Sequence, residues 1–362
     1  MKILFINDQF ERGGAGRVAA VLCNELYHRK DNEVILVCDS KHWVPIYHID
    51  DDIPVREIVV KTLKPGLAEK ILKWKRCIND IRKYIKEEKP DVIIATQAMM
   101  FLCAYLANRG LHVPIIAADH TSFSRKVDPV IDFVRYHLYS KADGLSILTQ
   151  KDFRLLGDKY PQKKVIYNPL SFPVLDKQVV RRKNILCAGR LEVWEIKGFD
   201  IIVDIWSRIH VKYPDWVLEI AGDGTEASHN YMKQMLVEKG VQDHVRLLGR
   251  VSDMKSLYAE SSIFALSSRM EGFPMVLMEA MSQGCACVAF SVGGSSDEMM
   301  SEKSGLLIPD GDASSFEAAL VRLIENGKER EAFSQSAIKE VSRFSVEKFV
   351  DDWEKLIDKA IL

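Results

Sequence analysis

Disulfide and metal-binding patterns are missing from this 362-residue sequence. Its seven cysteines are odd in number, scattered, and mostly placed inside apolar runs without metal-type spacing. This arrangement argues against a secreted disulfide scaffold and indicates a reduced environment such as the cytoplasm. No set of histidines and carboxylates has metal-ligand spacing either, so we expect neither a bound metal nor another cofactor. The cysteines are Cys23, Cys38, Cys77, Cys103, Cys187, Cys285 and Cys287.

Long uncharged segments are also scarce. The longest, Val92–Ala107, is shorter than a membrane span and is interrupted by Thr96 and Gln97, so it predicts a buried strand followed by a helix. Lys2 opens an expected strand that ends at Asn7, which leaves no room for the apolar core of a signal peptide. The sequence therefore favours a cytoplasmic protein.

The net charge of −1 conceals an unequal distribution between the two halves. Residues 1–170 carry 27 Lys and Arg against 21 Asp and Glu, whereas the remainder carries 23 against 30. The basic surplus is concentrated in Lys61–Lys89, where ten basic residues face four acidic ones around an apolar stripe that includes Trp74. This segment is either a solvated helix face over ordinary packing or a contact with an anionic membrane surface. We expect no nucleic-acid partner.

Apolar strands alternate with helical stretches along both halves, which is typical of doubly wound parallel sheets. In the first half we expect strands at Lys2–Asn7, Val34–Cys38, Val92–Ala95, Ile115–Ala118, Gly144–Leu148 and Val165–Tyr167. In the second half we expect them at Ile185–Ala188, Val217–Ala221, Val245–Leu248, Ile263–Ser267, Cys287–Phe290 and Gly305–Ile308. These patterns predict two α/β domains, residues 1–170 and 184–344, joined by a polar linker at 171–183.

Two glutamates eight residues apart, Glu271 and Glu279, are the most informative pair in the sequence. Glu271 lies in an expected strand-to-helix loop, and Glu279 lies inside the helix expected over Met275–Gln283. With a rise of about 1.5 Å per residue, the two carboxylates can bind hydroxyl groups on the order of 10 Å apart on one ligand. A retaining glycosidase pair is closer, roughly 5 Å, although a wider inverting pair is compatible with this spacing. The alternative is a loop glutamate that caps the helix and an exposed helix glutamate.

The residues between the two glutamates form the expected helix start. Pro274 suits the first helical position, where a missing N–H costs little. The amides of Gly272, Phe273 and Met275 can then point at an anion.

Two cations, Arg190 and Lys197, follow the first strand of the second half. Arginine binds phosphate oxygens as a fork and lysine binds them as a point charge. Together they could neutralise a departing diphosphate as its charge develops. The alternative is a surface arrangement in which they pair with Glu192 and Glu195.

Glycine-rich turns follow several expected strands. Gly13 and Gly14 belong to a Gly-x-Gly-x-x-Ala sequence, but several residues separate them from Asn7, which argues against a dinucleotide fingerprint. Their amides can still approach a phosphate at a helix start, although a loop without ligand contact is the alternative. Further turns of this kind contain Gly189, Gly222, and the pair Gly293-Gly294.

His120 is the one histidine of nine that directly follows an expected strand at the ligand-binding edge of a sheet. It is expected either to contact a ligand or to form a hydrogen bond within its own loop.

Three segments occur in a characteristic order: Gly-Arg-Leu…Lys-Gly-Phe-Asp from Gly189, Ala-Gly-Asp-Gly from Ala221, and Glu-Gly-Phe-Pro-x-Val-Leu-x-Glu-Ala-Met from Glu271. This order resembles glycosyltransferase family four, the retaining nucleotide-sugar transferases with the GT-B fold, of the bacterial surface-polysaccharide type. The resemblance runs from Met1 to the C-terminal helix and is most specific in the second half. It implies two Rossmann-like domains facing a central cleft, an acceptor-side domain at 1–170 and a donor-nucleotide domain at 184–344. The helix at 345–362 would pack back on the first domain.

The resemblance also implies roles for individual residues. Arg190 and Lys197 would hold the donor diphosphate, and Glu271 with the Phe273 amide would bind the donor sugar. Glu279 would bind the ribose. The sequence departs from the family pattern in one respect, because Lys197 follows Arg190 by seven residues rather than the usual five. Arg250 and Val251 would lie near the base, and His120 would touch the sugar from the other domain. The remaining donor-site residues would be Gly13, Gly14, Gly189, Gly222, Gly272 and Pro274.

The activity implied is that of a retaining hexosyl- or N-acetylhexosaminyl-type transferase. It would move a sugar, expected to come from a UDP-sugar, to a hydroxyl of a glycan that is expected to be lipid-linked at the inner face of the cell membrane. A sugar-nucleotide epimerase or hydrolase on the same fold is one alternative, although no acid–base pair for it is evident in the sequence. A non-catalytic nucleotide-sugar binder is another.

Overall fold

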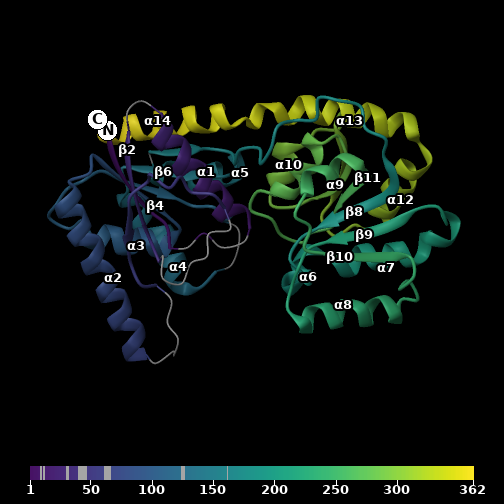
Figure 1. The fold of residues 1–362 in the computed structure, drawn as a ribbon, viewed down its shortest axis with the longest axis horizontal. Coiled ribbons are helices and arrows are strands. Elements are labelled where there is room, and N and C mark those ends of the chain that lie inside the picture. Colours follow the sequence, from purple (N-terminus) through teal and green to yellow (C-terminus); the bar gives the residue numbers. More distant parts are fainter. Residues whose placement is uncertain are drawn as a thin grey trace. The chain divides into compact units, whose positions relative to one another are not determined.

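The computed structural model describes residues 1–8, 10, 13–29, 32–39, 47–60, 67–123, 127–160 and 162–362. The chain divides into two compact units (Figure 1). Unit 1 comprises Met1–Pro169 together with Val346–Leu362, and unit 2 comprises Leu170–Ser345.

Unit 1 contains a seven-stranded parallel sheet of order β3-β2-β1-β4-β5-β6-β7. Its strands are β1 (Lys2–Ile6), β2 (Glu33–Cys38), β3 (Val55–Glu57), β4 (Val92–Thr96), β5 (Ile115–Ala118), β6 (Gly144–Ile147) and β7 (Lys163–Val165). Its α-helices are α1 (Gly14–His28), α2 (Leu67–Glu88), α3 (Ala98–Ala107), α4 (Pro129–Phe133), α5 (Gln150–Leu156) and α14 (Val346–Ile361). The inner strands are continuous apolar runs because packed helices bury the sheet.

The two edge strands of this sheet differ from the sequence predictions. The last strand is Lys163–Val165 rather than Val165–Tyr167, and β3 was not predicted. Both strands have three residues, and none of them is fully buried. An edge strand lacks a covering neighbour, so its sequence does not need the apolar run by which inner strands are recognised.

Helix α14 belongs to unit 1 although it is the last helix of the chain. Its buried face includes Trp353 and Leu356. Ion pairs fix the helix at its exposed side, from Arg29, which directly follows α1, to Asp351 at 2.5 Å and from Lys164 of β7 to Asp352 at 3.2 Å.

Unit 2 contains a six-stranded parallel sheet of order β10-β9-β8-β11-β12-β13. Its strands are β8 (Arg182–Ala188), β9 (Val217–Ala221), β10 (Val245–Gly249), β11 (Ser261–Leu266), β12 (Ala286–Ser291) and β13 (Gly305–Pro309). Its α-helices are α6 (Trp194–Lys197), α7 (Phe199–Ile209), α8 (Glu226–Glu238), α9 (Met254–Glu260), α10 (Met275–Ser282), α11 (Ser295–Met299), α12 (Ala313–Glu325) and α13 (Gly327–Val341).

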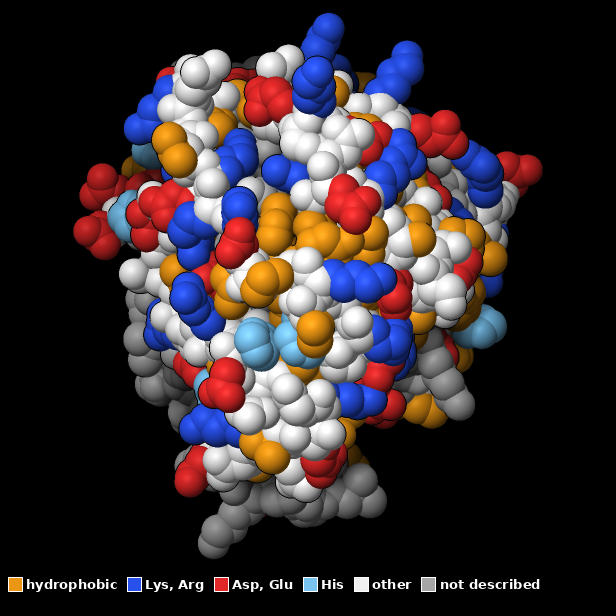
Figure 2. Space-filling view, turned by 90° about the vertical axis from the view of Figure 1, so that its right-hand side faces the viewer, with side chains coloured by type: hydrophobic (Ala, Val, Ile, Leu, Met, Phe, Trp, Pro, Cys, Tyr) orange, Lys and Arg blue, Asp and Glu red, His pale blue; other side chains and the backbone are white. Residues whose placement is uncertain are grey.

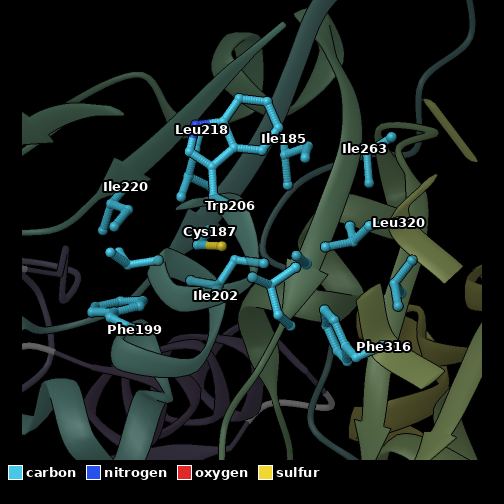
Figure 3. Close-up of a cluster of buried hydrophobic side chains, with 14 of the residues drawn as sticks. Ile185, Cys187, Phe199, Ile202, Trp206, Leu218, Ile220, Ile263, Phe316 and Leu320 are labelled. Carbon is cyan, nitrogen blue, oxygen red and sulfur yellow. The ribbon is translucent and has the colours of Figure 1, made fainter. Parts of the chain in front are cut away.

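The core of unit 2 lies between this sheet and its helices (Figure 3). Trp206 of α7 is 1% exposed and donates its indole N–H to the carbonyl of His244 at 2.9 Å, so the largest core side chain leaves no buried polar atom unpaired. Other core residues come from β8, β9, β11 and α12, and include Ile185, Cys187, Leu218, Ile220, Ile263, Phe316 and Leu320.

Strand order reverses at one place in each sheet, between β1 and β4 in unit 1 and between β8 and β11 in unit 2. In open α/β sheets, ligands bind beyond the carboxyl ends of the strands at such a switch point. The loops that follow β8 and β11 are therefore where a ligand of unit 2 is expected.

Among the described residues, no helix has both the length and the apolarity to cross a membrane, and no three His, Cys, Asp or Glu side chains are grouped as metal ligands. All seven cysteines are free and buried, and burial raises the pKa of the Cys285 thiol to about 12. On the face drawn in Figure 2, basic and acidic side chains are interspersed around hydrophobic ones.

Candidate functional site

An ion pair joins the two loops at the switch point of unit 2. The Lys197 ammonium nitrogen lies 2.8 Å from Oε1 of Glu271, and the two side chains are only 20% and 10% exposed. Lys197 ends α6 after β8, whereas Glu271 follows β11. Two residues that the sequence analysis selected independently are thus brought into direct contact.

Hydrogen bonds from Ser267 and Arg269 hold these two loops together. The Ser267 hydroxyl bonds the carbonyls of Lys197 and Gly198 at 3.2 and 2.8 Å, and the Arg269 amide donates to the carbonyl of Ile196 at 2.8 Å. The Arg269 guanidinium adds a bidentate bond to Asp200, at 2.7 and 2.6 Å. The Lys197–Glu271 pair is consequently supported by neighbours on both sides.

Gly198 fixes Lys197 from its C-terminal side. Its φ of 65° is left-handed, and a Cβ at this position would collide with the carbonyl of Ser267. The extra residues before Lys197 form short helical turns, one 3-10 turn at Leu191–Val193 and then α6. The ring of Trp194 in α6 stacks on Tyr231 of α8 at 4.5 Å. The two extra residues of the seven-residue spacing are therefore accommodated in the helical turns before Lys197.

Arg190 presents an uncommitted charge in the same region. The side chain is exposed and, among the residues that the structure describes, has no hydrogen-bond or ion-pair partner. A Cβ at the preceding Gly189 would lie 3.0 Å from Cγ of Lys197, so the Gly189 backbone runs beside the aliphatic part of the lysine side chain. Within the described chain neither cation pairs with Glu192 or Glu195, and that alternative is wrong.

Glycine backbone joins the carboxyl ends of β8, β9 and β10. Gly189 donates to the carbonyl of Ala221, and Gly222 donates to the carbonyl of Gly249, both at 2.9 Å. Gly222 has a φ of 154°, and a Cβ there would collide with the carbonyl of Gly189. Exposed Arg250 and half-buried Val251 directly follow Gly249. These ends therefore form one continuous rim.

The start of α10 differs slightly from the prediction. Pro274 is the residue before the helix rather than its first member, because the helical conformation begins at Met275. Phe273 is 6% exposed, with its ring edge against Phe344 at 5.6 Å. A Cβ at Gly293 would lie 3.3 Å from the Glu271 carbonyl, so the loop after β12 also borders Glu271.

Glu279 is buried inside α10, with 5% exposure, so the alternative of an exposed helix glutamate is wrong. Its Oε1 accepts a hydrogen bond from the Ser171 hydroxyl at 2.6 Å, and its Oε2 accepts one from the Tyr258 hydroxyl at 3.2 Å. Neither partner was selected from the sequence. They lie 108 and 21 positions away, so local spacing carried no sign of them.

His120 follows β5 in unit 1 and is half-buried. Both ring nitrogens are shielded from solvent, and in the described part of the chain neither forms the expected hydrogen bond within its own loop. Burial lowers the pKa of the imidazole, and the Asp119 carboxylate acts in the opposite direction. The ring is therefore neutral at pH 7.

The loop around His120 is fixed by a buried ion pair that the sequence analysis missed. Arg135 is 1% exposed, with Nε 2.8 Å from the Asp119 carboxylate and Nη2 2.7 Å from the carbonyl of Thr121. Its guanidinium carbon lies 4.0 Å from the ring centroid of Phe123. Arg135 belongs to a π-helical turn, Val134–Leu138, a rare conformation that is frequent at functional sites.

Gly13 and Gly14 begin helix α1 of unit 1. Gly13 has a φ of 135° and precedes the helix, which starts at Gly14. The Gly13 amide donates to the hydroxyl of Tyr47 at 3.1 Å. A phosphate contact by these glycines stays a prediction.

The basic segment predicted over Lys61–Lys89 lies in helix α2, apart from residues 61–66, which are outside the described chain, and Lys89, which follows the helix. Ile81 and Ile85 are buried against unit 1. Ile71 and Leu72, however, are 61% and 51% exposed, and Lys73 lies over the Trp74 ring at 4.3 Å. The apolar stripe is thus covered at one end of the helix and open at the other.

Comparison with known families agrees with this geometry. A family model described as Glycosyltransferase Family 4 matches residues 12–171, and one described as Glycosyl transferases group 1 matches residues 182–326. The chain belongs to glycosyltransferase family four, whose members are retaining enzymes that use nucleotide sugars, and its fold is GT-B.

Bacterial glycosyltransferases are among the proteins to which the chain is similar. The amylovoran biosynthesis glycosyltransferase AmsD of Erwinia amylovora is 24% identical over 370 residues, covering 99% of both chains. The GalNAc-alpha-(1->4)-GalNAc-alpha-(1->3)-diNAcBac-PP-undecaprenol alpha-1,4-N-acetyl-D-galactosaminyltransferase of Campylobacter jejuni is 25% identical over 367 residues, covering 99% of this chain and 98% of that one. The crystal structure of Anabaena HepE in complex with UDP is similar, with a TM-score of 0.79 and 20% identity, and covers 99% of this chain and 100% of that one.

Proposed function

We propose that the protein transfers a sugar, with retention, from a UDP-sugar to a hydroxyl of a lipid-linked glycan. The observation that carries this proposal is the Lys197–Glu271 pair, 2.8 Å apart at the switch point of unit 2. It puts a cation suited to phosphate beside a carboxylate suited to sugar hydroxyls. In a nucleotide sugar, the anomeric carbon joins the diphosphate to the hydroxyl-bearing sugar ring, so both kinds of group lie close together in one ligand.

The donor would extend along the carboxyl ends of the unit 2 strands. Its diphosphate would lie between Arg190 and Lys197, and the hydroxyls of its sugar would bind Glu271. Its ribose would bind Glu279, and its base would lie beside Arg250, which follows the rim of β10. Arg190 supports this arrangement because it is exposed and has no hydrogen-bond or ion-pair partner in the part of the chain that the structure describes, so its charge is available to the phosphate.

The proposed chemistry needs no enzymic nucleophile. The glycosidic bond to the diphosphate breaks while the acceptor oxygen bonds the anomeric carbon from the same face, and the departing phosphate oxygen takes the acceptor proton. Arg190 and Lys197 would stabilise the charge that develops on the diphosphate. Neutral His120 would contact the sugar, and the amides of Gly13 and Gly14 would contact phosphate. Unit 1 would bind the acceptor and unit 2 the donor.

Two relatives support the choice of substrates. HepE has been crystallised with UDP, which favours a uridine nucleotide over a guanosine or adenosine one. The Campylobacter enzyme is named for a glycan on PP-undecaprenol, which favours a polyprenyl-diphosphate acceptor.

The first experiment is a thermal-shift screen of UDP-, GDP- and ADP-sugars, because a ligand that binds only the folded state raises the melting temperature. A UDP-sugar that gives the largest shift is the expected result. Transfer is then measured with that donor and polyprenyl-linked glycans. Replacement Arg190→Ala should lower kcat by roughly 10²- to 10³-fold. The matched control is Lys183→Ala, which removes an exposed cation from the amino end of the same strand. Undiminished transfer by Arg190→Ala would contradict the proposal.

The same assay without acceptor separates the alternatives. Rapid conversion of the UDP-sugar to a new sugar or to free sugar would favour an epimerase or hydrolase. Donor binding with no turnover on any acceptor would favour a non-catalytic binder.

We also propose that the open end of helix α2 rests on an anionic membrane. Exposed Ile71 and Leu72 could enter the interface, while Lys75 and Arg76, also exposed, could bind anionic headgroups. In sedimentation with anionic liposomes, neutralising Lys70, Lys73 and Lys75 should reduce pelleting. Neutralising Lys212, Lys233 and Lys255, exposed lysines of unit 2, is the control. Equal pelleting of the two variants would contradict a specific role for α2.

A further inference from the structure

Glu279 receives hydroxyl donors from two segments that are distant in sequence. The Ser171 hydroxyl is 2.6 Å from Oε1, and the Tyr258 hydroxyl is 3.2 Å from Oε2. Tyr258 is fully buried in α9, beside the glutamate helix α10. Ser171 belongs to the segment that leads from unit 1 into unit 2.

The segment that carries Ser171 is itself fixed to unit 2. The Leu175 amide donates to the carbonyl of Ser282 at 2.8 Å, and the side chain of Gln283 donates to the carbonyl of Pro173 at 2.9 Å. The Phe172 ring packs against Tyr258, with centroids 6.4 Å apart. Ser171 is therefore held by its neighbours and does not depend on Glu279 for its position.

Donors on both oxygens determine how the carboxylate is oriented. One hydrogen bond would leave the group able to rotate about its terminal bond, which has a broad torsional minimum. A second bond, on the other oxygen and from a different segment, removes that freedom. A carboxylate offers about four acceptor sites, so an internal donor on each oxygen is compatible with hydroxyl donors from a ligand as well.

We propose that Ser171 is a positioning residue that orients Glu279 to receive the ribose hydroxyls of the donor nucleotide. This inference rests on the proposed function, in which Glu279 binds ribose. It adds that the enzyme distinguishes ribose from deoxyribose through a hydroxyl in its interdomain segment, outside the Glu-x7-Glu sequence. The segment that joins the two units is thereby part of the nucleotide site.

The test is calorimetric binding of UDP and of 2′,3′-dideoxy-UDP to the full-length protein. Wild type should bind UDP more tightly than the dideoxy nucleotide. Ser171→Ala should weaken UDP binding roughly tenfold, the effect of losing one hydrogen bond to a charged group, and should leave dideoxy-UDP binding unchanged. Ser171→Thr, which keeps a hydroxyl, should restore most of the difference.

Ser282→Ala is the matched control. Ser282 is also buried beside Glu279, but its hydroxyl donates to the Glu279 backbone carbonyl at 2.7 Å and not to the carboxylate. This variant should bind both nucleotides as wild type does, and melting curves confirm that all variants are folded.

Three results would overturn the inference. Equal weakening of both nucleotides by Ser171→Ala would show a general structural role. Unchanged or tighter UDP binding by the same variant would show that the serine does not assist the ribose site. A wild-type protein that binds both nucleotides equally would refute the ribose assignment of Glu279, and the inference with it. The last result concerns the proposed function, whereas the first two leave it intact.

Discussion

The candidate residues of the two units are held in opposite ways. In unit 2, Lys197 and Glu271 are paired with each other, so each site side chain fixes the other. In unit 1, the ring of His120 forms no ion pair, and Asp119 and Arg135 instead hold the loop around it, among the described residues. The candidate residues of unit 2 are held by their own charges, whereas the His120 loop of unit 1 is held by the Asp119–Arg135 ion pair.

This difference matters for how a ligand can be received. In a half-buried ion pair each charge is already compensated, so a phosphate that binds Lys197 must compete with the Glu271 carboxylate for it. A desolvated neutral imidazole carries no charge that a ligand must displace, and its shielded nitrogens can form a hydrogen bond with a ligand hydroxyl. The comparison predicts that mutations in the two units will affect stability and binding in different proportions.

The largest effect is expected in unit 1, for Arg135→Met. This replacement leaves the Asp119 carboxylate buried without its cation, which should lower the free energy of unfolding of this unit by about 3–5 kcal/mol. The control is Arg269→Met in unit 2, where the partner Asp200 is 32% exposed and the loss should stay below about 1 kcal/mol. Urea titrations monitored by circular dichroism measure both. If Arg135→Met does not fold, the milder Arg135→Lys should still lose more stability than Arg269→Met. Equal losses would break the comparison.

An intermediate effect is expected for the unit 2 pair. Lys197→Met and Glu271→Gln should each destabilise, and the double variant should recover part of the sum, with a coupling of about 1–2 kcal/mol. UDP binding should behave differently, because the double variant regains stability without regaining the cation. Denaturation and calorimetric titration of all four proteins test this. Strict additivity in stability would show that the 2.8 Å pair makes no net contribution.

The smallest effect concerns pH. Burial lowers the pKa of His120 below its unfolded value of about 6.5, so the neutral ring favours the folded state. This contribution is complete above that pH and is lost as the pH falls below it, when the unfolded chain binds the proton first. His120→Gln should therefore reduce the fall in unfolding free energy between pH 7.5 and 5.5, and His137→Gln, a substitution at an exposed position, is the control for the loss of a histidine. An unchanged slope in His120→Gln would indicate a solvated ring.

The sequence predicted the inner strands of both sheets because burial on two faces requires continuous apolar runs. It also selected Lys197 and Glu271 separately, from their places after expected strands. It could not predict that they touch, because 74 positions separate them and the contact exists only through the order of β8 and β11. Arg135 and Ser171 escaped notice for the same reason. Their partners are defined by folding, and nothing in the neighbouring residues distinguishes them from ordinary helix or linker positions.

Gly198 has a consequence for protein engineering. Because its left-handed backbone packs against Ser267, Lys197 is held in place from its C-terminal side, whereas the segment between Arg190 and Lys197 is held by buried Leu191 and by the stacking of Trp194 on Tyr231. Shortening or lengthening the segment between Arg190 and Lys197 should change the distance between these two cations without displacing Lys197. The length of this segment would then determine which diphosphate geometry the two cations can bind, while the Lys197–Glu271 ion pair keeps its position.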